Sequence, residues 1–195
     1  MNAVTIIWSA FLCGVDHWMD IWGDPLLSGA IFMASYGVTA LLIFRVARGV
    51  TARENLYWRI CGFLFLFQML NTNLDLHALI FTTGRCLAHA QGWYENRREF
   101  QVIFLLGLAV IISFILLAVL VVFFRNIFAN ILLTMGVLIA LGFTIIKGIN
   151  YHNIEQYYSV QIGPFRVADF IEFSGIALAN IAALIRLHLN RLGHR

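Results

Sequence analysis

The hydrophobic positions of the chain fall into long runs separated by short polar stretches. A helix that crosses a bilayer needs roughly 20 apolar residues. Five runs come close to that length or exceed it, and they predict membrane-spanning helices over residues 26–44, 57–80, 100–124, 127–147 and 167–187. Residues 1–22 predict a sixth, shorter hydrophobic helix, which either crosses or lies in the interface, where its Trp side chains are well placed. No Lys or Arg precedes Arg45, so the basic start of a secretory signal is missing and we expect this helix to be retained.

Composition agrees with this pattern. The chain has 195 residues, of which 61% are hydrophobic and 12% charged, and its mean hydropathy is +0.84. A soluble domain carries about 25% charged residues. We therefore expect an all-α, polytopic transmembrane bundle of five or six helices, with residues 1–195 in a single domain. Residues 82–99 are expected to form an outer interfacial loop.

The distribution of Lys and Arg predicts the orientation, because cytoplasmic loops are enriched in both. With the loop between Arg45 and Arg59 in the cytoplasm, that side also receives Arg48, Arg53, Arg125, Arg186, Arg191 and Arg195. The other side receives Arg85, Arg97, Arg98, Lys147 and Arg166. The C-terminus is then cytoplasmic, and the predicted location is a cell membrane. All carboxylates except Glu54 fall on the outer side or in the outer half of a span.

The predicted span over residues 57–80 carries ionisable groups at its outer end. Asp75 and His77 continue an apolar run, where such side chains are costly and usually functional. At helical spacing Gln68, Asn71, Asp75 and Thr82 form one polar stripe, and Asn73 and His77 form an opposed one. The span is therefore central, or its outer end rises into the headgroups or bends. The asparagines either join neighbouring helices by hydrogen bonds or belong to a binding site.

The predicted span over residues 167–187 has a similar outer end. Asp169 and Glu172 stand three residues apart, and Asp169 alone is explained as a helix cap. Below Glu172, a face of Gly175, Ala179 and Ala182 would let another helix approach closely. We expect the span over 57–80 to be that partner, which would bring Glu172 toward Asp75 or His77. These three residues are the catalytic candidates.

Other outer residues suggest a metal site. Asp16, His17 and Asp20 lie near the N-terminus, and His152 and Glu155 follow the fourth span. With Asp75 and His77 they offer oxygen and nitrogen ligands for Zn, Fe, Mn or Cu. Their spacing matches no specific metal motif, and solvated interfacial charges are the alternative explanation. A haem held between His77 and His152 is a further alternative.

The segment between the second and third spans carries candidate binding residues. Arg85 and His89 are one helical turn apart, Trp93 and Tyr94 form an aromatic pair, and Arg97 and Arg98 can meet lipid phosphates or Asp75. A plain helix lying on the headgroups is the alternative. With Asn71 and Asn73, these residues complete the predicted binding set.

A motif runs through the same region: Leu70-Asn71, Leu74-Asp75-Leu76, Gly84-Arg85, Gly92-Trp93-Tyr94, Arg97-Arg98 and Gln101. It resembles the pattern of a family of small bacterial multi-pass membrane proteins. The resemblance covers about thirty residues and departs from the family at Tyr151-His152-Asn153. It implies a bacterial inner-membrane protein and supplies no activity and no catalytic residue.

The remaining observations narrow the class of function. Cys13 and Cys86 can both approach the outer face, but a disulfide between them cannot be deduced from sequence. The net charge of +3 is spread over two membrane sides, which suits anionic lipids and not nucleic acid.

We expect an accessory or assembly subunit that binds lipids and other integral membrane proteins or copies of itself. The first alternative is a metal-dependent hydrolase of lipid-linked substrates that uses Asp75, His77, His152 and Glu172, and the second is a haem electron-transfer protein.

Overall fold

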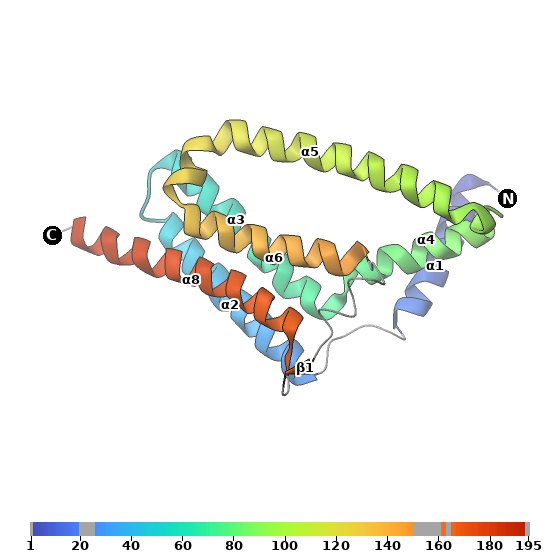
Figure 1. Cartoon of the computed structure of the whole chain (residues 1–195), viewed down its shortest axis with the longest axis horizontal. Coiled ribbons are helices and arrows are strands. Elements are labelled where there is room, and N and C mark those ends of the chain that lie inside the picture. Colours follow the sequence, from blue (N-terminus) through green and yellow to red (C-terminus); the bar gives the residue numbers. More distant parts are fainter. Residues whose placement is uncertain (1, 20–25, 150–160, 163–164, 194–195) are drawn as a thin grey trace. The chain divides into compact units, whose positions relative to one another are not determined.

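The computed structural model describes residues 2–19, 26–149, 161–162 and 165–193, which are almost entirely helical (Figure 1). The helices are α1 (Ala3–Met19), α2 (Leu26–Ala47), α3 (Ala52–Leu74), α4 (Leu76–Ala90), η1 (Tyr94–Asn96), α5 (Arg97–Ala129), α6 (Ile131–Ile149) and α8 (Val167–Gly193). Two-residue strands, β1 (Gln161–Ile162) and β2 (Phe165–Arg166), pair in antiparallel fashion before α8. The predicted all-α class is confirmed.

Two helices of the described part are long and apolar enough to cross a membrane. They are Gly29–Ala47 within α2 and Asp169–Leu192 within α8. Shorter apolar helical segments cover Val4–Met19, Leu117–Ala129 and Ile131–Thr144. The structure thus agrees with a membrane protein in general terms, and a bundle of five or six spans stays a prediction.

The helix predicted over residues 57–80 is interrupted. It ends at Leu74, and α4 begins at Leu76. Between them Asp75 has a left-handed backbone (φ 44, ψ 50), a conformation that Asp tolerates better than most residues. Of the three arrangements considered for this span, the break corresponds to the bent one. The expectation of an outer loop over 82–99 is also wrong in part, because α4 extends to Ala90.

A kink marks the boundary between the third and fourth predicted spans. A single element, α5, runs through the predicted break at residues 125–126 and ends at Ala129. Phe123 within it has a non-helical backbone (φ −111, ψ 15), so the direction changes near the predicted end of the third span. The predicted end of the third span, at residue 124, lies next to this kink.

The chain divides into two compact units. The first comprises Met1–Gly23 and Leu74–Phe124, and the second comprises Asp24–Asn73 and Arg125–Arg195. In the first unit α1 and α4 lie side by side and run in opposite directions, since Cys13 meets Cys86 while Trp18 meets Leu74. The two units are described separately below.

The second unit is built from α2, α3, α6 and α8. Helices α2 and α8 run in the same direction, because Phe32 stacks on Phe173 at one end and Gly49 approaches Asn190 at the other. Helices α3 and α6 also share a direction, since Tyr57 bonds Thr134 and Gln68 bonds Thr144. Helix α3 runs opposite to α2. The fully buried large side chains of this core are Phe32, Tyr36, Ile43, Trp58, Phe65 and Leu133.

A close helix contact in the second unit joins α6 and α8. A Cβ atom on Gly136 would lie 2.7 Å from the carbonyl oxygen of Gly175 and 2.9 Å from the amide nitrogen of Ala179. The small face predicted around Gly175 therefore does bring two backbones together. Its expected partner is wrong, however, because the face meets α6 and not α3. Glycine on both helices is what permits this approach.

We predict that Gly136→Ala lowers the free energy of unfolding by roughly 1–3 kcal/mol, because the added methyl group forces the two backbones apart. Gly142→Ala in the same helix is the matched control, since a Cβ there meets nothing within 4 Å. We expect it to be neutral or to gain up to about 1 kcal/mol from helix propensity. Unfolding of both variants in detergent would be compared, and equal stabilities would contradict the proposed contact.

Candidate functional site

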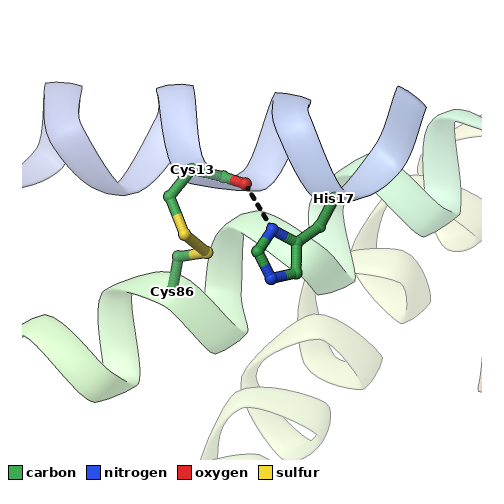
Figure 2. Close-up of side chains that lie close together, drawn as sticks. All are labelled: Cys13, His17 and Cys86. Carbon is green, nitrogen blue, oxygen red and sulfur yellow. Dashed lines mark hydrogen bonds between the residues drawn. A yellow bond between two sulfur atoms is a disulfide. The ribbon is translucent and has the colours of Figure 1, made fainter. Parts of the chain in front are cut away.

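The first unit holds a cluster of three reactive side chains, Cys13, His17 and Cys86, which we call the α1–α4 cluster. Cys13 and His17 are four residues apart, so both project from one face of α1. Cys86 reaches them from α4 and forms a disulfide with Cys13, as Figure 2 shows. Cys86 is buried, Cys13 is half-buried and His17 is exposed. The pairing that the sequence left open is thus made in the structure.

Close packing of α1 on α4 supports the cluster. A Cβ on Gly14 would lie 2.6 Å from the Cα of Thr83, so only glycine allows this approach. The Thr82 hydroxyl donates a hydrogen bond to the Gly14 carbonyl at 2.9 Å. At the other end of the contact, Trp18 Nε1 donates to the carbonyl of Leu74 at 2.8 Å. That bond satisfies a carbonyl that the end of α3 leaves without a helical partner.

The α1–α4 cluster differs from the predicted metal site. Ligand atoms of Cys13, His17 and Cys86 lie within 4.8 Å of one another, and this is the group in the described part of the chain that could hold a metal ion. Of the predicted ligands, it contains His17 alone. Asp16 is exposed on the same helix, while Asp20, His152 and Glu155 lie outside the described residues. The predicted haem pair includes His152 and is likewise not described.

Asp75 is the residue between the end of α3 and the start of α4. Its carbonyl accepts hydrogen bonds from the amides of Ala78 at 2.8 Å and Leu79 at 3.3 Å, which start α4 immediately after the break. The side chains of Asn73, His77, Arg97 and Arg98 are not among those described, so their predicted roles stay predictions. The structure supports a conformational role for Asp75 at the start of α4.

The remaining predicted binding residues gather at the end of α4. Arg85 and His89 are exposed. The His89 ring stacks on Tyr94 with centroids 3.7 Å apart, and Trp93 Nε1 donates to the Gln91 side-chain oxygen at 2.7 Å. The aromatic pair is therefore held against the helix end by local contacts.

The second unit holds buried polar groups. Tyr36 donates a hydrogen bond to the Glu172 carboxylate at 2.7 Å, and both side chains are buried, with 0% and 6% exposed. Gln68, also buried, donates to the Ala140 carbonyl at 3.0 Å and to the Thr144 hydroxyl. Asn71 is buried one turn further along α3. Glu172 and Asn71 were singled out by the sequence, and both occupy the interior of the bundle.

Tyr36 is the buried partner of a predicted site residue that the sequence reasoning missed. It stands in the apolar run over 26–44, where Thr39 lies on nearly the same helix face, and this short polar face was the available signal. The expected approach of Glu172 to Asp75 or His77 joins the two units and stays a prediction. The described partner of Glu172 is Tyr36.

Comparison of the chain with protein-family models, curated proteins and solved structures finds no match. The resemblance to a bacterial membrane-protein family therefore stays a prediction from the motif residues.

We predict that Tyr36→Phe lowers the free energy of unfolding by roughly 1–3 kcal/mol, because it removes the donor that the buried Glu172 oxygen accepts from. Glu172→Gln keeps an oxygen acceptor facing Tyr36 and should cost less. Ser35→Ala is the matched hydroxyl deletion on α2, since Ser35 bonds only locally to the Ile31 carbonyl, and it should change stability by less than about 0.5 kcal/mol. Thermal unfolding in detergent measures all three, and a loss in Tyr36→Phe no larger than in Ser35→Ala would contradict the prediction.

Proposed function

We propose that the chain is an integral membrane protein that acts as an accessory or assembly subunit of a larger membrane complex. Its partners are other integral membrane proteins or further copies of the chain, with lipids around them. The motif resemblance supports a bacterial inner membrane as the location.

Exposed apolar side chains support membrane insertion. Val38, Leu41, Phe63 and Leu184 lie on the outside of the second unit and are 54–69% exposed. Water-soluble proteins rarely expose large contiguous apolar surfaces, whereas a bilayer solvates them. Together with the two membrane-capable helices, this exposure favours a protein surrounded by lipid.

The basic residues of the second unit support one orientation. The C-terminal ends of α2 and α8 and the N-terminal ends of α3 and α6 share one end of the bundle. The Arg186–Glu54 ion pair at 2.7 Å and the Asn126–Arg53 hydrogen bond join helices there. This end carries Arg45, Arg48, Arg53, Arg59, Arg125, Arg186 and Arg191. By the positive-inside rule, we assign it and the C-terminus to the cytoplasm.

The disulfide supports the complementary assignment of the α1–α4 cluster. Disulfides persist in oxidising compartments such as the periplasm and are rare in the cytosol. The predicted topology places residues 13 and 86 on the outer side, where such a bond is stable. Two independent signals, arginine placement and cysteine pairing, therefore favour the same orientation.

The subunit proposal rests on the exposed face of α5, which combines apolar side chains of the kind that lipid also solvates with a groove. Ile103, Leu106, Val110, Phe114, Leu117 and Val121 recur at intervals of three and four residues and are 54–69% exposed. A shallow apolar groove on this face is lined by Leu106, Val110, Ser113, Phe114 and Leu117. By contrast, the polar groups of Tyr36, Glu172 and Gln68 bond within the bundle. The exposed apolar face and the internally bonded polar groups together favour binding of a partner by α5 over a catalytic site inside the second unit.

The two alternative functions gain less support. The hydrolase requires His77 and His152 as well as Asp75 and Glu172, and the haem protein requires the same two histidines. His152 lies outside the described residues, and Glu172 bonds Tyr36 within the core. No described contact favours either alternative over the subunit.

We predict that a cysteine at Gln91 labels with a membrane-impermeant maleimide in intact cells, and that one at Arg48 labels only after permeabilisation. Both positions are exposed, and Cys61→Ala removes the free native thiol from both variants. The reversed labelling pattern would contradict the proposed orientation. Labelling of both positions in intact cells would contradict a crossing between them.

We predict that a photocrosslinking residue at Val110 or Phe114 gives a discrete protein adduct in native membranes. The same residue at Leu41, which is 69% exposed on α2, serves as the control and should give lipid adducts alone. Mass spectrometry of the adduct identifies a second membrane protein or a second 22.1 kDa chain. Lipid adducts alone at all three positions would overturn the subunit proposal.

A further inference from the structure

The α1–α4 cluster combines two sulfur atoms with an imidazole, which is a donor set for a thiophilic metal ion. We propose that the cluster binds one Cu(I) ion after its disulfide is reduced, through the sulfur atoms of Cys13 and Cys86 and through Nε2 of His17. The proposal does not depend on the subunit function, because it concerns the purified chain alone.

The geometry of the two helices brings these donors together. One ligand atom of each residue, which for His17 is one of its two ring nitrogens, already lies within 4.8 Å of the others. Two thiolates bound to one three-coordinate ion, each at about 2.3 Å, lie about 4 Å apart. Breaking the sulfur–sulfur bond lets the sulfur atoms separate to that distance while the helices stay packed at Gly14. Thiolate ligands select Cu(I) and zinc, and imidazole suits both metals. Three protein donors are one fewer than a closed structural zinc site uses, which favours Cu(I).

The hydrogen bond of His17 prepares its ring for a metal. Nδ1 lies 3.1 Å from the Cys13 carbonyl oxygen, and Figure 2 shows the ring beside the disulfide. A carbonyl oxygen can only accept, so Nδ1 carries the hydrogen in this bond, and in the neutral ring Nε2 then has the free lone pair. Metal-binding histidines usually donate their other N–H to a carbonyl or carboxylate in this way. The bond thus fixes the tautomer that ligation requires.

Conversion of the disulfide form of the cluster to the Cu(I)-bound form requires a reductant and releases protons. A dithiol reductant transfers two electrons and two protons to the Cys13–Cys86 disulfide, giving two thiols and an oxidised reductant. Cu(I) then binds the sulfur atoms as thiolates, and their two protons pass to solvent. His17 is exposed and Cys13 is half-buried, so reductant and ion can both reach the cluster. Either the disulfide or the metal ion joins α1 to α4.

The experiment uses the full chain in detergent with Cys61→Ala, which removes the remaining thiol. Cu(I) affinity would be measured by competition with a chromophoric chelator, before and after reduction by a dithiol. X-ray absorption would report the donor atoms. We expect one Cu(I) per chain in the reduced protein, none in the oxidised protein, and sulfur together with nitrogen donors in the absorption spectrum.

His17→Ala tests the site without touching the disulfide, and since His17 is exposed the variant should fold. We expect its Cu(I) affinity to fall by about 10–100-fold, by analogy with other losses at a metal centre, and the nitrogen donor to vanish. His188→Ala removes an exposed imidazole that belongs to no proposed site and should leave affinity unchanged. Absence of Cu(I) binding after reduction, or equal affinity in His17→Ala and His188→Ala, would overturn the proposal.

Discussion

The contact between α6 and α8 sets the register of the second unit. Gly136 and Gly175 let two backbones approach within van der Waals distance, which in lipid is a main source of helix association. One turn from Gly175, Glu172 reaches Tyr36, and Ala140 beside the same contact accepts a hydrogen bond from Gln68. The close approach of α6 and α8 therefore positions the acceptors of both hydrogen bonds, Glu172 and the Ala140 carbonyl. Through these bonds, Tyr36 joins α2 to α8 and Gln68 joins α3 to α6.

Much of the fold could be predicted from the sequence. The apolar runs over 26–44 and 167–187 correspond to α2 and α8, and the small face around Gly175 does meet another helix. The predicted partner, the span over 57–80, was wrong. A face of small residues indicates that another helix can approach closely, but it does not identify that helix. The break at Asp75 was only one of three arrangements that the sequence allowed. A single left-handed residue, without Pro or Gly, does not change the hydropathy pattern.

The candidate site was less predictable, for a different reason. His17 was singled out, yet its neighbours in space are Cys13 and Cys86, which hydropathy and helical periodicity cannot pair across 73 positions. Glu172 was recognised by the cost of a carboxylate in an apolar run. Its partner Tyr36 lies on another helix, and the faces of two helices meet only once their packing is known. Functional residues on a single helix can be recognised from the sequence, whereas a site formed by residues of two helices cannot.

The sequence separation of the disulfide has a consequence for biogenesis. Cys86 lies 73 positions after Cys13, so the disulfide cannot form until both helices have been synthesised. In the proposed topology, its formation also requires both cysteines to reach the oxidising side of the membrane. The covalent link between α1 and α4 therefore depends on the oxidative folding system of the cell.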